Sequence, residues 1–254
     1  MAKTHLGFLL SETRLHVANI SEGNFVELGQ LEFQGKKDFQ YKEQIQAFLQ
    51  DLKIDQHDYD EYSLSWFTPF STLVPTNIFG ASDSKTVFQA CFTKEMIAND
   101  IDYNRISELS IVNIYEIPLW VKSFFVIRYP RIVIQHEASV FLRGIFATST
   151  FKLGIHILLH DSHCCMVFVK ENELKFYNCF ESSSEDDVLY YLTFGLQQQG
   201  LTGENGTLFV YDHLTSHSDR KNKILTKAAL ILELKNLQAA ETAYLPYKYQ
   251  QHCV

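Results

Sequence analysis

The fold is decided by the stretch from Thr4 to Phe33, which reads THLGFLLSETRLHVANISEGNFVELGQLEF. Three runs of strand-forming residues, His5 to Leu10, Arg14 to Ile20 and Phe25 to Phe33, are separated by short polar stretches. Ser, Gly and Asn in these stretches favour tight turns between strands. The segment is therefore predicted to form a three-stranded antiparallel meander.

A helix and a fourth strand are expected directly after the meander. Asp38 is a favourable N-cap residue, and apolar residues then follow with the spacing of one helix face. These residues are Tyr41, Ile45, Phe48, Leu49 and Leu52. The next apolar run, from Tyr62 to Phe67, predicts a strand.

The same order recurs in the second half of the chain. Strands are predicted at Gly154 to His160, Cys164 to Lys170 and Glu173 to Phe180, with turns at 161–163 and 171–172. Ser184 or Ser183 then caps a helix that begins with three acidic residues, as its dipole favours. The inner face of that helix contains Val188, Tyr191, Leu192, Gly195 and Leu196.

Two further elements close the second half, a strand at Gly206 to Tyr211 and a helix from about Asp219 to Leu237. A repeat of this length indicates duplicated domains, because solenoid repeats are only about 20 to 50 residues long. We therefore expect two similar lobes, 1–150 and 151–254. The first lobe is completed by a strand at Ile132 to Gln135 and a helix at Glu137 to Ala147.

The stretch from Thr68 to Tyr129 does not fit the repeat and is predicted to be an insertion in the first lobe. It contains a polar loop at Phe79 to Ser84, a strand at Ser110 to Ile117 and a helix opened by Pro118.

Two copies of three strands, a helix and a strand resemble the actin-like ATPase fold, an α/β fold with mixed sheets built from two ribonuclease-H-like halves. The position of the insertion is similar to that in bacterial actin-like proteins of pilus assembly and cell division. Four motifs resemble an uncharacterised bacterial family with this fold: Leu64 to Pro75 (LSWFTPFSTLVP), Ile114 to Pro118, Asn178 to Phe180 and Tyr190-Tyr191. The resemblance spans almost the whole chain and implies a fold without an assigned activity.

The resemblance also implies where a nucleotide site would lie. In actin-like ATPases the first hairpin turn of each lobe carries an Asp and a Gly, because backbone N–H groups approach the phosphates while a carboxylate organises the metal. A glycine-rich turn near the end of the second lobe holds the adenosine.

All three turns depart from that pattern. The first, Leu10 to Arg14, has neither Asp nor Gly, and only Glu12 and Arg14 could substitute. The second keeps Asp161 without a Gly, and the third, Tyr211 to Ser216, contains Asp212 without glycines. A Cβ restricts such a turn and blocks the phosphate. We therefore predict a degenerate nucleotide site, with Glu12, Asp161 and Asp212 as its remnants and no catalytic residue. In the simpler interpretation these three residues and Ser11 are ordinary solvated turn residues.

A second group of polar residues has metal-ligand side chains: His156, His160, His163, Asp161, Cys164 and Cys165. In a strand His156 and His160 share one face but are about 13 Å apart, too far for one ion unless the strand bends. His160 and His163 flank a turn and could approach each other. The ligand types suit a transition metal but the spacing does not, so no metal site is assigned.

Composition excludes several classes of protein. A formal net charge of −8 without a basic run argues against general nucleic-acid binding. No apolar window reaches the roughly 18 to 20 residues of a membrane helix, and the N-terminus lacks the apolar core of a signal peptide. The five cysteines have no CxxC spacing and read as buried thiols of a reducing compartment. A cytoplasmic location is expected, with no membrane insertion.

Three hypotheses of function follow. The first is a non-catalytic protein, a pseudo-ATPase that binds a protein partner or itself and needs no cofactor. The second is a divergent ATPase or nucleotide-gated switch that binds Mg-ATP between its lobes through Glu12, Asp161 and Asp212. The third is a metal-dependent enzyme that uses the region from His156 to Cys165.

Overall fold

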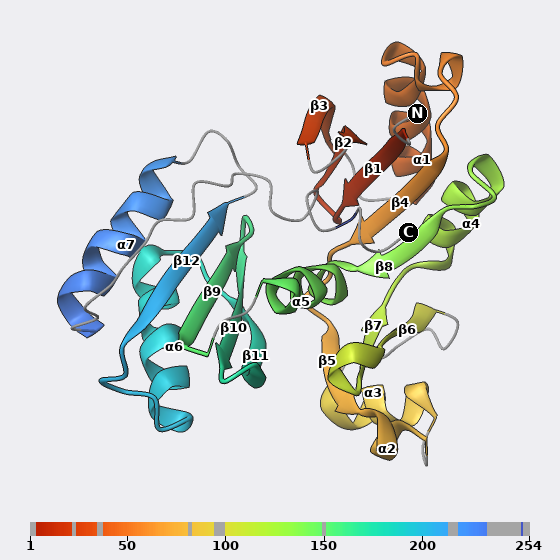
Figure 1. Cartoon of the computed structure of the whole chain (residues 1–254). Helices are drawn as coiled ribbons and strands as arrows, with labels where there is room; N and C mark the ends of the chain where they lie inside the picture. Colours follow the sequence, from red (N-terminus) through yellow and green to blue (C-terminus); the bar gives the residue numbers. More distant parts are fainter. Residues whose placement is uncertain are drawn as a thin grey trace. The chain divides into compact units, whose positions relative to one another are not determined.

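The computed structural model describes residues 4–21, 24–34, 38–80, 83–93, 100–148, 151–212, 218–232 and 250. Contacts divide the chain into two compact units, Met1–Gly144 with Pro246–Val254, and Ile145–Leu245. Figure 1 labels the elements of both units. The repeat-based lobes 1–150 and 151–254 stay a prediction.

The first unit begins with the expected meander. Strands β1 (His5–Leu10), β2 (Arg14–Ser21) and β3 (Asn24–Glu32) pair antiparallel in chain order. β4 (Glu61–Trp66) then pairs parallel to β1, and β8 (Val133–His136) pairs parallel to β4. The five-stranded sheet therefore has the order β3-β2-β1-β4-β8.

Two helices cover one face of this sheet, α1 (Asp38–Asp51) and α4 (Leu119–Arg128). A short 3-10 helix, η1 (Ile54–Gln56), follows α1. Alternation along β1 turns every second residue toward the helices, and these residues join helix residues in one core: Leu6, Phe8, Leu10, Ile45, Leu49, Val121 and Phe125. Because α4 belongs to this core, it is the crossover helix between the parallel strands β4 and β8. Helix α5 (Glu137–Ala147) follows β8.

The inserted segment has a small sheet of its own, with the order β5-β7-β6. β7 (Ile111–Glu116) was expected, whereas β5 (Ser71–Pro75) and β6 (Ile101–Ile106) were not. Helices α2 (Thr76–Phe79) and α3 (Ser84–Cys91) precede β6, and η3 (Ser107–Leu109) follows it. The polar loop predicted from Phe79 to Ser84 was wrong at its first residue, because Phe79 is buried in the core of the insertion.

The second unit repeats the topology of the first. β9 (Leu153–Leu159), β10 (His163–Lys170) and β11 (Glu173–Glu181) form an antiparallel meander, and β12 (Gly206–Asp212) pairs parallel to β9. The order β11-β10-β9-β12 matches β3-β2-β1-β4 of the first unit. The chain thus contains two ribonuclease-H-like units, as the repeat predicted.

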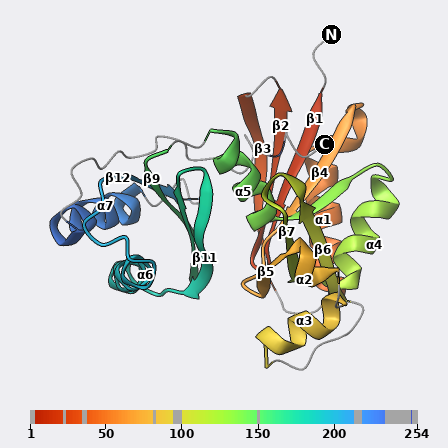
Figure 2. The ribbon, with the colours of Figure 1, turned by 60° about the horizontal axis from the view of Figure 1, so that its bottom comes forward.

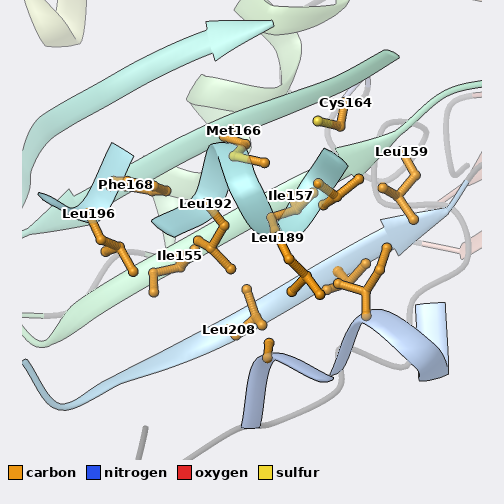
Figure 3. Close-up of a cluster of buried hydrophobic side chains, with 14 of the residues drawn as sticks. Ile155, Ile157, Leu159, Cys164, Met166, Phe168, Leu189, Leu192, Leu196 and Leu208 are labelled. Carbon is orange, nitrogen blue, oxygen red and sulfur yellow. The ribbon is translucent and has the colours of Figure 1, made fainter. Parts of the chain in front are cut away.

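Helices α6 (Glu185–Gln198) and α7 (Ser218–Leu232) pack on the same core of the second sheet. Figure 3 shows Leu189, Leu192 and Leu196 of α6 pointing toward the strands, where they meet Ile155, Ile157, Met166, Phe168 and Leu208. The predicted cap is confirmed. Ser184 accepts from the Asp187 N–H at 3.2 Å, and the Asp187 carboxylate accepts from the Ser184 N–H at 2.9 Å.

Gln250 is the one described residue of the C-terminal segment and lies in the first unit. It is buried, and its Nε2 donates to the Phe8 carbonyl of β1 at 2.9 Å. A Cβ at Gly7 would stand 2.6 Å from Ile20 Cδ1 and 2.7 Å from Gln250 Oε1, so a larger residue here would push these two side chains aside. The sequence repeat alone did not predict this return of the chain to the first sheet.

Figure 2 shows the same elements after a rotation of 60°. None of the helices in the described ranges is long and apolar enough to span a membrane.

Candidate functional site

The turn between β1 and β2 is held by Ser11. Its Oγ lies 3.2 Å from the backbone N of both Thr13 and Arg14 and accepts from both N–H groups. Its own N–H donates to the Arg14 carbonyl at 2.9 Å. A phosphate-binding turn needs N–H groups that point at the anion. In this turn the Ser11 hydroxyl accepts from two such N–H groups.

Glu12 is exposed in that turn, and its negative charge acts on Tyr41 of α1. Burial and, to a smaller degree, the charges of Glu12 and Asp38 raise the pKa of the Tyr41 hydroxyl. Arg14, the other group that could have substituted for the missing Asp, forms an ion pair with Glu32 across β2 and β3 at 3.8 Å.

The corresponding turn of the second unit is held by an arginine. The His160 N–H donates to the His163 carbonyl at 2.8 Å, which closes the turn between β9 and β10. Arg220 of α7 donates to the His160 carbonyl at 2.9 Å and to the Ser182 carbonyl at 3.4 Å. Arg220 therefore ties the first turn of α7 to this hairpin turn. Asp161 is exposed in the turn.

Asp161 and Asp212 lie at the same edge of the second sheet. Asp212 is the last residue of β12 and pairs with Leu159, the last residue of the parallel strand β9. Asp161 follows Leu159 by two residues. The Asp212 side chain is buried, in contrast to that of Asp161. Ligands of α/β sheets bind at this carboxyl edge. Glu12 belongs to the other unit.

The described histidine and cysteine side chains of the second unit lie in different environments and do not converge on one point. His156 is buried, stacks on Phe209 with ring centroids 4.7 Å apart, and lies 2.9 Å from the Tyr211 hydroxyl through Nδ1. Cys164 belongs to the core under α6, and the His163 ring lies 2.9 Å from the Ser162 hydroxyl. Among the residues that the structure describes, no three His, Cys, Asp or Glu side chains could hold one metal ion.

A buried polar cluster at the end of β8 was not predicted. The His136 Nδ1 accepts from the Ala138 N–H and the Asn113 side-chain amide, each at 3.1 Å. A backbone N–H can only donate, so Nδ1 carries no proton and Nε2–H donates to the Thr68 carbonyl at 3.0 Å. The same Asn113 amide also donates to Ser139 Oγ at 3.0 Å.

Asn104 completes this cluster, which we call the His136 cluster. Its Oδ1 accepts from the His136 N–H at 2.7 Å and from the Ser139 hydroxyl at 3.1 Å. Asn104 lies on β6 and Asn113 on β7, so the cluster joins the inserted sheet to the main sheet and to α5. The polar run Gln135-His136-Glu137 at the end of a buried strand was the available sequence signal.

Glu137 is the first residue of α5 and is only 3% exposed. It follows β8 at the carboxyl edge of the parallel strands, the edge that also carries the Ser11 turn. A buried carboxylate at such an edge is a candidate binding residue, and it was not predicted from the sequence.

A model of one protein family matches residues 2–227, described as a protein of unknown function (DUF3822). The chain belongs to this family. No curated protein matches the sequence significantly.

Two solved structures are similar to this DUF3822 protein. One is a Bacteroides thetaiotaomicron protein with an actin-like ATPase fold and unknown function, with a TM-score of 0.81, 14% identity, and coverage of 99% of this chain and 96% of that one. The other is a chain of the PilM-PilN type IV pilus biogenesis complex, with a TM-score of 0.59, 9% identity, and coverage of 96% and 89%. At these identities the matches show the fold, and the fold is that of the actin-like ATPases.

Proposed function

We propose that this DUF3822 protein is a non-catalytic, cytoplasmic actin-like protein that acts by binding another protein chain. The Ser11 turn carries the proposal. Its hydroxyl accepts from the N–H groups of Thr13 and Arg14, the kind of group that binds phosphate in an anion-binding turn. A nucleotide would have to displace this hydroxyl and enter a turn without glycine.

The turn of the second unit supports the same conclusion. Its backbone is closed by the bond from His160 to His163 and is fixed by Arg220. The guanidinium of Arg220 on α7, a group that could bind an anion beside that turn, donates to two carbonyls instead. We therefore propose that Glu12, Asp161 and Asp212 are remnants that do not turn over ATP.

An exposed aromatic pair on α6 supports a role in binding. Tyr190 and Phe194 are 64% and 43% exposed, one helical turn apart, with their rings stacked at a centroid distance of 6.3 Å. The helix begins with Glu185, Asp186 and Asp187, of which Asp186 pairs with Lys227 at 2.7 Å. Exposed aromatic residues are common anchors of interfaces. We call Asp186, Tyr190 and Phe194, which follow one another at intervals of four residues on one helix face, the α6 surface.

The chemistry of the α6 surface favours a basic amphipathic segment as its partner. Apolar side chains of such a segment would cover the two rings, and its Lys and Arg residues would face the exposed Asp186 carboxylate and the ring faces. The net charge of −8 favours a basic partner over a second copy of this chain. The PilM-PilN complex, in which a protein of similar fold was solved with another, supports a binding role for this frame.

A labelled synthetic peptide that forms a Lys/Leu amphipathic helix tests this surface by fluorescence anisotropy. We expect the Tyr190→Ser/Phe194→Ser double variant to bind at least ten times more weakly than the parent protein. Leu230→Ser is the matched control, because Leu230 is an exposed apolar residue of α7, 80% exposed, outside the α6 surface. Equal affinity of the parent and the double variant would reject the α6 surface. Light scattering reports whether a second copy occupies it instead.

The alternative function is a nucleotide-gated switch that binds Mg-ATP. Glu137 favours it, since a carboxylate that is 3% exposed at the carboxyl edge of parallel strands is typical of a ligand site. In this alternative the candidate Mg²⁺ ligands are Glu12 and Glu137 in the first unit and Asp161 and Asp212 in the second. The metal-dependent enzyme gains no support, because the described residues bring no three ligands together.

A further inference from the structure

Two cysteines of the second sheet lie side by side on neighbouring strands. Cys165 of β10 is paired directly opposite Cys179 of β11, and their Sγ atoms are 3.0 Å apart. Neither sulfur is in a disulfide in the structure. Of the other described cysteines, Cys91 contacts the Thr72 hydroxyl at 3.8 Å, and Cys164 lies in the core under α6.

A β-bulge sets this arrangement. The two-residue turn at Glu171 and Asn172 pairs Lys170 with Glu173, and that register would place Cys165 opposite Asn178. The register shifts by one residue between Phe168 and Val169, and the shift brings Cys179 into place. Bulges of this kind re-aim side chains near functional positions.

The strand geometry permits a bond between the two sulfurs. Opposed residues of antiparallel strands have Cα atoms about 4.5 to 5.5 Å apart, which lies inside the range of disulfides, about 4.4 to 6.8 Å. The strands therefore need no rearrangement to be cross-linked.

The two thiols differ in access. Cys165 is buried, whereas Cys179 is half-buried on the edge strand β11. Cys164 is a different case, because it lies in the core under α6 and burial raises its thiol pKa to about 12. An oxidant in solution therefore meets Cys179 first.

We propose that Cys165 and Cys179 form a reversible dithiol site that takes small two-electron oxidants, peroxides or low-molecular-weight disulfides. With hydrogen peroxide, the Cys179 thiolate attacks one oxygen, the O–O bond breaks, and water leaves after taking up a proton. The Cys165 thiolate then attacks the sulfenic sulfur of Cys179, the S–O bond breaks and a second water leaves. The two thiols lose two electrons and peroxide gains them. A thiol reductant reverses the cross-link by exchange.

This site is independent of the proposed function and of the α6 surface. In a reducing compartment such a pair is reduced at rest, and cytosolic disulfides are mostly transient. Oxidation would fasten the edge strand β11 to β10 on the sheet face opposite the helices.

Peptide mapping tests the proposal on the full chain carrying Cys91→Ser and Cys253→Ser, the latter outside the described residues. The protein is treated with hydrogen peroxide or glutathione disulfide, alkylated with N-ethylmaleimide and digested with trypsin. We expect the peptide 153–170 to be linked to the peptide 176–220 in nearly all chains, with two thiols lost per chain and restored by dithiothreitol.

Two variants identify the cysteines whose sulfurs form the cross-link. Cys164→Ala, checked for folding by circular dichroism, should keep the linked peptides. Cys165→Ser should lose the link and leave Cys179 as a mixed disulfide with glutathione. A link that persists in Cys165→Ser, or glutathionylated Cys179 without any link in the parent chain, overturns the proposal.

Discussion

Replacing His136 by leucine is expected to lower the free energy of unfolding by about 3 to 5 kcal/mol. His136 is 1% exposed and each of its ring nitrogens is hydrogen-bonded. Leucine would fill most of the volume but leave the Ala138 N–H, the Thr68 carbonyl and one proton of the Asn113 amide without partners. Each buried group left in this way costs about 1 to 3 kcal/mol.

The stability losses caused by substituting His136 and Asn113 should not be additive. Asn113→Leu removes the amide that donates to both His136 and Ser139, so its loss should overlap with that of His136→Leu. The double variant is therefore expected to lose less stability than the two single variants summed, by about 1 kcal/mol or more.

Urea unfolding followed by circular dichroism measures these losses. His57→Leu is the matched control, because His57 is exposed and a surface change there should stay within about 0.5 kcal/mol. A His136→Leu loss below about 1 kcal/mol would mean that the inserted sheet is held to the main sheet by other contacts.

Lowering the pH should weaken the fold through His156. Burial lowers the pKa of His156 from 6.5 to about 3. Between these values the unfolded chain takes up a proton at His156 and the folded chain does not. The contribution of neutral His156 is therefore complete above pH 6.5 and is lost as the pH falls toward 3, by about 1.4 kcal/mol per pH unit.

His156→Phe isolates this effect, since phenylalanine keeps an aromatic ring beside Phe209 but does not titrate. Between pH 7.5 and pH 5.0 the parent protein should lose about 2 kcal/mol more than the variant in urea unfolding. The pKa of His5 is also lowered, but His5 is present in both proteins, so its effect on stability cancels in the comparison. Parallel pH profiles would show that His156 is protonated in the folded protein.

Local patterns were sufficient to predict the repeated frame. Apolar spacing located α1 and α6, and Ser184 marked the start of α6 together with its capping box. The turn at Glu171 and Asn172 was also predicted, and both residues have positive φ, as a tight two-residue hairpin turn requires.

Features that depend on contacts between different elements could not be predicted from the sequence. β5 and β6 are the short edge strands of the insertion, and β5 pairs with β7 about 40 residues further along the chain, so local sequence does not reveal its partner. The contact between Cys165 and Cys179 depends on a bulge, and a shift of one residue changes every opposed pair. The contacts of Arg220 could not be predicted because its two carbonyl partners lie 38 and 60 positions away in the sequence.

At the candidate site, the sequence located the turns and the missing glycines. The role of Ser11 as acceptor for two backbone N–H groups emerged only from the turn geometry. Glu137 and the His136 cluster were missed because one polar residue after a buried strand is a common feature, and only burial distinguishes these residues.

Thermal unfolding of the purified protein with and without millimolar Mg-ATP, Mg-ADP or Mg-GTP shows whether the degenerate site still binds a nucleotide. A ligand at about 100 times its dissociation constant adds about 2.7 kcal/mol to the free energy of unfolding, a shift that is easily measured. For a protein that has lost its nucleotide site, we expect no shift with any of the three nucleotides. An upward shift with one of them that disappears in Asp161→Ala would contradict this expectation and make the protein a nucleotide-gated switch.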